Sequence, residues 1–299
     1  MKKKSDAFSL RHPAVNFLFF AYAIVFGMVI VHPAYVLSAL IASGAYWLVL
    51  SGSRGARTIL KLLPMWIFLA GINPLLNTYG EHILFYVGTR PYTLEALLYG
   101  MTVSGAFIAV LQWFMCYQRV MTGDKFTFLF GNLIPALSLL LVMVFRLAAL
   151  FEKKAVQIAS ARKCVGHGAN ADSKRMDKLR DGAVVLGTLT GWALENSVIT
   201  ADSMRSRGYG TGKRSSFRLT KFENSDLILI VILTVFAAGT LVCALCGAVA
   251  AVYTPSIQIA SVKGFSNIFG LIAYNILLLI PVFDDIREEI QWRISISKI

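Results

Sequence analysis

Charged residues are scarce in this sequence. Only 15% of its 299 residues are Asp, Glu, Lys or Arg, whereas 57% are hydrophobic. A soluble domain of this length carries about 25% charged residues. The shortage of charge therefore excludes an ordinary soluble domain and favours a chain embedded in a membrane.

Cysteine and histidine are also few, with four of each. Cys116 and Cys164 stand alone. Cys243 and Cys246 form a C-x-x-C inside an apolar run, without a second pair or nearby histidines, so we expect buried small residues that pack helix on helix. The histidines are scattered over the first half of the chain: His12, His32, His82 and His167. No nucleophile, base and orienting group occur together, so the sequence predicts no catalytic site, no metal site and no cofactor.

Six apolar runs are long enough to cross a bilayer, which takes about 20 helical residues. They cover Ala14–Val31, Pro33–Leu50, Ile59–Thr78, Leu94–Tyr117, Leu227–Val252 and Phe265–Phe283. Small residues in the fourth run, among them Gly100, Ser104 and Gly105, are typical of close helix contacts in membranes. The sequence thus predicts an all-α, polytopic membrane helical bundle of about six spans.

The distribution of Lys and Arg sets the orientation, because cytoplasmic loops retain these residues. The chain begins Met1-Lys2-Lys3-Lys4, and a later loop is expected to carry Arg54, Arg57 and Lys61. With the N-terminus inside, only Arg90 in a hairpin over residues 79–93 and Lys263 in a loop over residues 253–264 fall outside. We therefore expect a multi-pass protein of the cytoplasmic membrane with both termini cytoplasmic.

The formal net charge of +13 raises the question of a polyanionic partner. Nucleic-acid binding is disfavoured, because aromatic side chains that stack on bases are scarce in the basic middle of the chain. Basic loops that face anionic lipid are the preferred reading.

Two further apolar stretches, Leu133–Phe151 and Ala183–Ile199, are interpreted as amphipathic helices along or under the membrane. If both crossed, the basic segment between them would be exported. That segment holds Lys153, Lys154, Arg162, Lys163, Lys174, Arg175, Lys178 and Arg180. Arg146, Glu195 and Asn196 would also be costly in lipid. The expected organisation is a four-span bundle over 1–118, a cytoplasmic insert of amphipathic coupling helices over 119–222, and two spans with a charged tail over 223–299.

The two insert helices are predicted to end alike, each with a small residue and an arginine before a glycine stop. Their apolar faces are expected to be Phe145, Ala148, Glu152, Ala155 and Ala159 in one, and Val185, Leu189, Trp192, Asn196, Ile199 and Ser203 in the other. The tips are Ala161-Arg162-Lys163, with a stop near Gly166, and Arg205-Ser206-Arg207-Gly208. Glycine favours the left-handed conformation that ends a helix, and arginine is a planar fork suited to carboxylates. The alternative is that both are ordinary helix ends whose arginines reach lipid headgroups.

Two other local patterns have plain interpretations. The run from Gly208 to Arg214 looks like a phosphate cradle but lacks the G-x-x-x-x-G-K-[ST] spacing and a preceding strand, so a flexible turn is preferred. The acidic run of Asp284, Asp285, Glu288 and Glu289 is read as a solvated helix face with Arg287 and Arg293.

With these motifs in order, the chain resembles the transmembrane T component of energy-coupling-factor transporters, within the cobalt-transport permease superfamily. The resemblance runs from about Asn73 to the C-terminus. It rests on Asn73-Pro74-Leu75 followed by Gly80, on Thr93-Leu94-Glu95, on Arg146 through Arg162, on Ala201–Gly210, and on Ile280-Pro281 through Trp292-Arg293. The first arginine motif departs from the family pattern, because Lys163 stands where a glycine is expected.

The resemblance implies a non-catalytic coupling subunit of an ATP-driven importer of vitamins or of transition-metal ions such as cobalt or nickel. In that family, two cytoplasmic ATP-binding subunits receive the arginine-bearing helices, and a small membrane subunit binds the substrate. By analogy the ATPase-coupling residues are Ala161, Arg162, Lys163, Arg205, Ser206, Arg207 and Gly208.

Two other functions remain as alternatives. A stand-alone secondary transporter would place charged residues at mid-membrane and show repeated halves. A membrane-embedded enzyme would gather His, Asp or Glu at the edge of a span. The six predicted spans contain almost no ionisable residues, which favours the coupling subunit.

Overall fold

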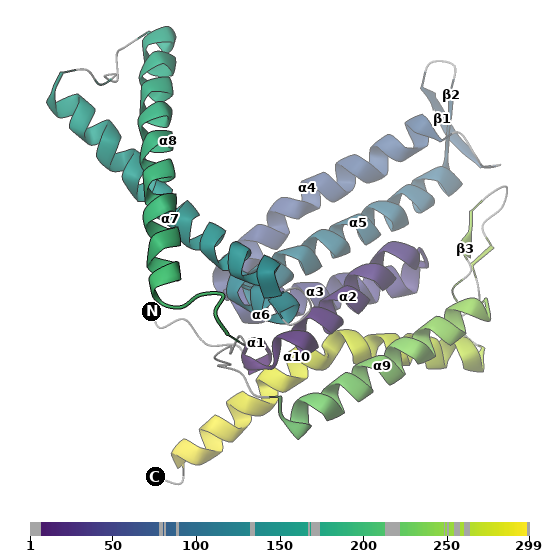
Figure 1. Cartoon of the computed structure of the whole chain (residues 1–299). Coiled ribbons are helices and arrows are strands. Elements are labelled where there is room, and N and C mark those ends of the chain that lie inside the picture. The colour runs from purple at the N-terminus through teal and green to yellow at the C-terminus, as the bar shows by residue number, and fades with distance from the viewer. Residues whose placement is uncertain are drawn as a thin grey trace. The chain divides into compact units, whose positions relative to one another are not determined.

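A computed structural model describes residues 7–77, 80, 82–87, 90–131, 135–166, 168, 174–212, 222–247, 249, 251–253, 258–259 and 264–297. Helices dominate these residues, so the predicted all-α polytopic bundle is confirmed (Figure 1). Several positions used in the sequence argument lie outside the described residues: Met1–Lys4, Tyr79, His167, Lys213–Arg214 and Lys263.

The chain forms two compact units, one within Met1–Lys125 and Thr220–Ile299 and the other within Phe126–Leu219. The helices of the first unit are α1 (Ala7–Leu10), α2 (Pro13–Val29), α3 (Pro33–Ser51), α4 (Ser53–Leu76), α5 (Leu94–Val120), α9 (Asn224–Leu245) and α10 (Phe265–Ser297). Its two antiparallel hairpins pair β1 (Ile83–Val87) with β2 (Arg90–Thr93), and β3 (Ala251–Val252) with β4 (Gln258–Ile259). The second unit holds α7 (Pro135–Cys164) and α8 (Arg175–Ser206), and α6 (Gly123–Gly131) contains the boundary.

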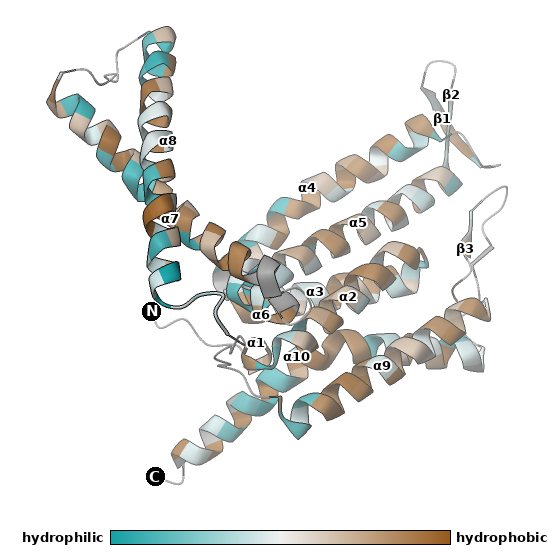
Figure 2. Cartoon of the chain, viewed as in Figure 1, coloured by the Kyte–Doolittle hydropathy of each residue, from teal (hydrophilic) through white to brown (hydrophobic). Residues whose placement is uncertain are grey.

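Five helices, α3, α4, α5, α9 and α10, are long and apolar enough to cross a membrane. Figure 2 shows α9 hydrophobic along most of its length, whereas α8 mixes hydrophilic and hydrophobic positions. The sixth expected span, α2, is apolar but has 17 residues, or about 26 Å, which is the lower limit for crossing. In contrast, α10 has 33 residues, or about 50 Å, and so exceeds the hydrocarbon core.

Two expected span boundaries are wrong. Helix α4 begins at Ser53, so Arg54, Arg57 and Lys61 lie in its first turns rather than in a loop. Helix α9 ends at Leu245 rather than at Val252. It stops there because Gly247 takes a φ of 81° and its N–H donates to the carbonyl of Ala244 at 3.1 Å.

This early stop separates the two cysteines of the C-x-x-C. Cys243 is buried as expected, and a Cβ added at Gly270 of α10 would come within 2.9 Å of its Cβ. Cys246 is exposed at the end of α9, which corrects the expectation that it packs between helices.

Helices α2 and α3 begin with the same three residues, His-Pro-Ala. The Nδ1 atoms of His12 and His32 accept hydrogen bonds from the N–H groups of Ala14 and Ala34, at 3.2 and 3.3 Å. Proline follows each histidine at the first helical position, where a missing N–H costs nothing. Burial lowers the pKa of His12, which favours the neutral ring that this cap requires.

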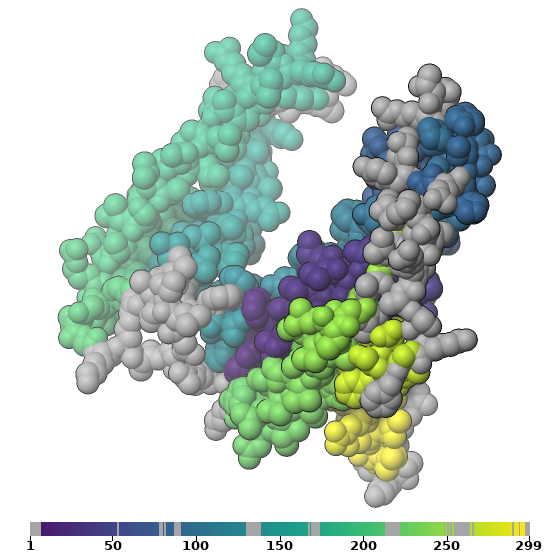
Figure 3. All heavy atoms as spheres, turned by 90° about the vertical axis from the view of Figure 1, so that its right-hand side faces the viewer, coloured from purple at the N-terminus to yellow at the C-terminus, as the bar shows by residue number. Residues whose placement is uncertain are grey.

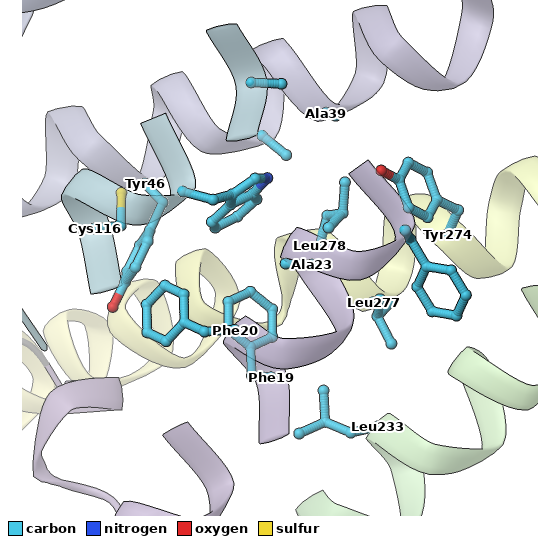
Figure 4. Packing of buried hydrophobic residues seen from close by; sticks show 14 of the residues in the cluster. Phe19, Phe20, Ala23, Ala39, Tyr46, Cys116, Leu233, Tyr274, Leu277 and Leu278 are labelled. Atoms are coloured by element: carbon cyan, nitrogen blue, oxygen red, sulfur yellow. The ribbon is translucent and has the colours of Figure 1, made fainter. Parts of the chain in front are cut away.

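Aromatic side chains of α2 form the centre of the first unit. Phe19 and Phe20 meet the ring of Trp113 in α5 edge-on, with centroids 5.5 and 6.3 Å apart. Figure 4 shows Phe20 beside Tyr46 of α3, with Leu277 and Leu278 of α10 on the opposite side of α2. Because lipid tails are as apolar as these side chains, close packing rather than removal from water stabilises the bundle. In Figure 3, side chains of α9 and α10 also pack directly against each other.

Small residues bring α4 and α5 into close contact, as the sequence predicts. A Cβ added at Gly100 would lie 2.7 Å from the Cβ of Asn73 and 2.8 Å from the carbonyl oxygen of Ala70. One at Gly105 would lie 3.0 Å from Val36 of α3. Helix α5 thus approaches the backbone of α4 at Gly100 and the side chain of Val36 in α3 at Gly105.

The acidic run in α10 fastens the N-terminal helix, which corrects its interpretation as a solvated face. The guanidinium of Arg11 donates two hydrogen bonds to Asp284, at 2.9 and 3.0 Å. The carboxylate of Asp285 accepts from the backbone N–H groups of Ala7 and Phe8, at 2.7 and 3.4 Å. The side chain of Asp284 is only 11% exposed. Glu288 is exposed, and the side chains of Glu289 and Arg293 lie outside the described residues.

We predict that Gly100→Ala loosens the contact between α4 and α5, because the new methyl group overlaps the carbonyl of Ala70. Overpacking of this kind costs about 1–3 kcal/mol. The matched control is Gly71→Ala in α4, where a Cβ meets nothing within 4 Å and alanine favours the helix by up to about 1 kcal/mol. The purified chain is heated in detergent, and the fraction that stays monodisperse is measured by size-exclusion chromatography. The temperature at which half of this fraction is lost should be lower for Gly100→Ala alone. Equal midpoints for the two variants would contradict the close packing.

Candidate functional site: the helical hairpin with two arginine ends

Helices α7 and α8 form an antiparallel hairpin held at two levels. At the first, the rings of Phe151 and Trp192 meet edge-on with centroids 5.9 Å apart, and the Nζ of Lys154 lies 5.4 Å from the Trp192 ring. A cation over an indole face gains about 0.5–2 kcal/mol. The space-filling view shows side chains of α7 and α8 in contact with each other (Figure 3).

At the second level, Arg162 of α7 donates from Nε to Oδ1 of Asp181 in α8, at 2.7 Å. Phe151 and Arg162 are about three helical turns apart, and so are Asp181 and Trp192. Because three turns return a helix to the same face, both levels lie on one continuous contact between the helices. The hairpin register is therefore fixed by an aromatic pair and an ion pair.

The contact face of α8 agrees in part with the predicted stripe. Val185, Leu189, Trp192 and Asn196 are partly buried, whereas Ile199 and Ser203 are exposed. On α7 the expected face is wrong at its start, because Phe145, Ala148 and Glu152 are exposed. Ala155 and Ala159 are partly buried, as expected, and so are Leu147, Leu150, Phe151, Lys154, Ile158 and Arg162. This face includes the basic residues Lys154 and Arg162, which a search for regularly spaced apolar residues leaves out.

The end of α8 is a complete Schellman motif. The N–H of Tyr209 donates to the carbonyl of Met204, and the N–H of Gly208 donates to the carbonyl of Arg205, both at 3.0 Å. Gly208 takes a φ of 77°, the left-handed conformation that the motif requires. Arg207 is the last residue before this glycine, and its side chain is exposed. The predicted glycine stop of the second tip is confirmed.

The end of α7 follows the same rule at Gly166. The N–H of Gly166 donates to the carbonyl of Lys163 at 3.1 Å, and its φ is 78°. The helix itself ends at Cys164, so Lys163 lies inside the last turn and the stop comes later than the family pattern has it. Gly166 thus ends the helix three residues after Lys163.

The other predicted site residues surround the two arginines. Ala161 and Lys163 are exposed beside Arg162, and Arg205 and Ser206 are exposed beside Arg207. The Ser206 hydroxyl donates back to the carbonyl of Asp202 at 2.9 Å, so it points back along the helix rather than beyond its end.

The two arginines lie at opposite ends of the hairpin. Arg162 is bound to Asp181 near the start of α8, and Arg207 follows about 26 residues later, or about 39 Å along the helix axis. A single carboxylate or groove cannot receive both. Two binding surfaces, or two copies of one surface, would be needed.

A second set of motif residues meets where α4 ends and α5 begins. Thr93 caps α5 by accepting from the N–H of Ala96, and the buried carboxylate of Glu95 accepts from the backbone N–H and contacts the ring of His82. A Cβ added at Gly80 would come within 2.4 Å of Glu95, and Gly80 takes a φ of 124°. Gly80, the last residue of the Asn-Pro-Leu…Gly pattern, therefore lies directly against Glu95 of the Thr-x-Glu pattern.

Two features of the hairpin were missed by sequence reasoning. Asp181 was not singled out, although a lone acid flanked by Arg180 and followed by Gly182 is an identifiable signal. The sequence indicates the cation–π contact of Lys154 only if the two helices are first paired antiparallel in the register that brings Trp192 beside it. Within the described ranges, no group of three His, Cys, Asp or Glu side chains could hold a metal ion.

Comparison with protein-family models and with curated protein sequences found no match. The function must therefore be argued from the residues and their geometry.

We predict that Gly208→Ala frays the last turn of α8. A left-handed conformation costs an L-residue about 1–2 kcal/mol, and the new Cβ would also lie 3.2 Å from the Thr211 hydroxyl. The backbone N–H groups of residues 208 and 209 close the motif, and their hydrogen exchange should be faster in Gly208→Ala than in wild type. Gly187→Ala, in mid-helix with open space around it, is the control and should leave that exchange unchanged. Unaltered exchange in the Gly208 variant would contradict the capping role.

Proposed function

We propose that the chain is the transmembrane coupling subunit of an ATP-driven importer of the energy-coupling-factor type. It would link two cytoplasmic ATP-binding subunits to a small membrane subunit that binds a vitamin or a transition-metal ion. The chain itself would hydrolyse no ATP and carry no cofactor. The observation that carries this proposal is the hairpin with an arginine at each end.

The chemistry of Arg207 supports a docking role. An exposed guanidinium on a blunt helix end presents several donors in a fixed plane, a geometry that matches a partner's carboxylate. Its backbone is held by the Schellman motif, so little backbone entropy is lost on binding. In the part of the chain that the structure describes, Arg207 forms no ion pair that would compete.

The separation of the tips supports a partner with two equivalent surfaces. Because Arg162 and Arg207 are about 39 Å apart, two copies of an ATP-binding subunit provide a natural pair of sites. A rigid hairpin held at two levels would pass a displacement of one tip along its length. The same rigidity would couple ATPase movement to the substrate-binding subunit.

The charge distribution supports the proposed orientation in the cytoplasmic membrane. Arg11, Arg54, Arg119 and Lys125 all lie at the end of the first unit where Asp284 and Asp285 fasten α1. The positive-inside rule assigns this end, and with it both termini, to the cytoplasm. Anionic headgroups would face these residues.

The alternative of a stand-alone secondary transporter receives less support. Among the described residues of the first unit, the buried carboxylates Glu95 and Asp226 lie in the first turns of α5 and α9 rather than at mid-span. Asp226 there accepts from the N–H of Glu223 at 3.3 Å, which is a capping role. Ion-coupled transporters usually carry such groups near the bilayer centre.

The test is retention of ATP-binding subunits by the tagged full chain, purified in mild detergent from membranes of its native cells. Partners are identified by photolabelling with azido-ATP. Wild type is expected to retain them, and Arg162→Glu/Arg207→Glu is expected to lose them, because each lost arginine–carboxylate contact costs about 2–5 kcal/mol. Arg207→Glu alone should give an intermediate loss.

The control is Lys153→Glu, which reverses an exposed charge on α7 about 14 Å along the helix from Arg162. It should retain the partners at the wild-type level. If no labelled subunit is retained by wild type, or if a well-folded double variant keeps it, the coupling role is wrong. If the control loses the ATP-binding subunits to the same extent, the loss reflects the net charge of the hairpin and not a contact of the two arginines.

A further inference from the structure

We infer that the hairpin of β1 and β2 binds the lipid interface of the membrane, with the apolar side chains of β1 among the headgroups and the upper acyl chains. The hairpin lies at the end of α4 and at the start of α5 (Figure 1). The inference concerns the first unit alone. It does not rest on the proposed coupling function, because it needs only a bundle that is embedded in a membrane.

Strand β1 presents an unbroken apolar surface. Its sequence is Ile-Leu-Phe-Tyr-Val, and the side chains of Ile83, Leu84, Phe85 and Tyr86 are between 47% and 65% exposed. A hairpin with one face in water alternates apolar and polar side chains, and β1 does not. An exposed apolar strand at the edge of a sheet promotes aggregation in water. An apolar cover is therefore expected over β1.

The length of α4 places its end at the membrane surface. From Arg57, in the basic first turns, to Leu76, the last residue, the helix rises about 28 Å, which nearly matches a hydrocarbon core of about 30 Å. Lys61 lies one turn further along, and its long side chain can extend back toward the surface. The end of α4 thus lies at the level of the opposite headgroups.

Tyr92 of β2 holds the hairpin beside the last turns of α4. Its hydroxyl donates to the carbonyl of Gly71 at 3.3 Å, about 7.5 Å before the end of the helix at Leu76. Its ring stacks on the ring of Phe85, with centroids 4.5 Å apart and planes inclined by 14°. Because Phe85 rests on a side chain bound below the end of α4, β1 is kept at the level of the interface.

The apolar surface of β1 continues the exposed surfaces of the two helices. Among the exposed side chains are Ile67, Phe68 and Leu76 of α4, and Leu98 and Tyr99 of α5. Both helices are long and apolar enough to cross a membrane, so lipid covers these side chains. Aromatic residues are enriched where acyl chains meet headgroups, as they are in this hairpin. One lipid environment therefore accommodates the helices and β1 together.

The test places a fluorescent nitrobenzoxadiazole label on β1 in the full chain. The four native cysteines are replaced by serine or alanine, and one cysteine is introduced in each of three chains. The substitutions are Tyr86→Cys on β1, Val235→Cys in the middle of α9 and Ser295→Cys near the end of α10. Each labelled chain is reconstituted into phosphatidylcholine vesicles that carry a nitroxide either on the headgroup or near the end of the acyl chain.

The headgroup nitroxide should quench the label at residue 86 at least about twofold more than the acyl-chain nitroxide, because interfacial side chains enter only about 5–10 Å. The label at residue 235, where the native side chain is exposed at mid-helix, should show the opposite order. Residue 295 lies about 45 Å along α10 from Phe265, beyond the hydrocarbon core, so neither nitroxide should quench its label. If the label at residue 86 responds like either of the other two labels, the inference is wrong.

A matched pair of variants tests whether the apolar side chains of β1 cause the lipid contact. Leu84→Asp should lower headgroup quenching at residue 86 at least about twofold, because a carboxylate is costly among acyl chains, and Leu84→Val should leave it unchanged. Equal quenching in the two variants would contradict the inference. A blue-shifted label that neither nitroxide quenches would mean that a second copy of the chain covers β1, which also overturns it. If Leu84→Asp aggregates in detergent, the comparison of residues 86, 235 and 295 decides alone.

Discussion

The cost of placing a charge in hydrocarbon, about 3 kcal/mol or more at a bilayer centre, divides this chain into two kinds of helix. Helices α3 and α9 carry almost no charge, and the bundle to which they belong packs through aromatic and small side chains, as around Trp113 and Gly100 of α5. Helices α7 and α8 carry charges along their length and pair through them, at Lys154 and between Arg162 and Asp181. At one end of the first unit, Asp284 binds Arg11, and Asp285 binds the backbone of the N-terminal segment.

Most of the fold could be predicted from the sequence because a membrane demands long apolar helices. Each of the six expected spans corresponds to a helix. Their ends were harder to predict, because hydropathy does not indicate where the backbone turns. Arg54 and Arg57 are helical and lie in the first turns of α4, and Gly247 ends α9 within a continuous apolar run. The His-Pro-Ala starts of α2 and α3 were a readable signal, because each supplies a side-chain cap and a proline at the first helical position.

The candidate site was predictable only where its chemistry is local. Gly166 and Gly208 end their helices as expected, because a glycine stop depends on its neighbours in sequence. Partners from another helix were not predictable from one chain alone: Asp181 for Arg162, Trp192 for Lys154 and Asp284 for Arg11. Periodicity selected Phe145 for the contact face, yet the face that forms includes Lys154 and Arg162, whose stems pack while their charges find partners.

The central claim is that the arginine-bearing hairpin lies on the cytoplasmic side, and the two exposed native cysteines test it most directly. Cys164 lies beside Arg162 at the end of α7, and Cys246 ends α9 at the opposite side of the bundle from Asp226. A membrane-impermeant maleimide is applied to right-side-out and inside-out vesicles, with Cys164→Ser and Cys246→Ser chains to assign each signal. We predict labelling of Cys246 only in right-side-out vesicles and of Cys164 only in inside-out vesicles. Labelling of Cys164 from the outer face, or of both cysteines from one face, would contradict the account.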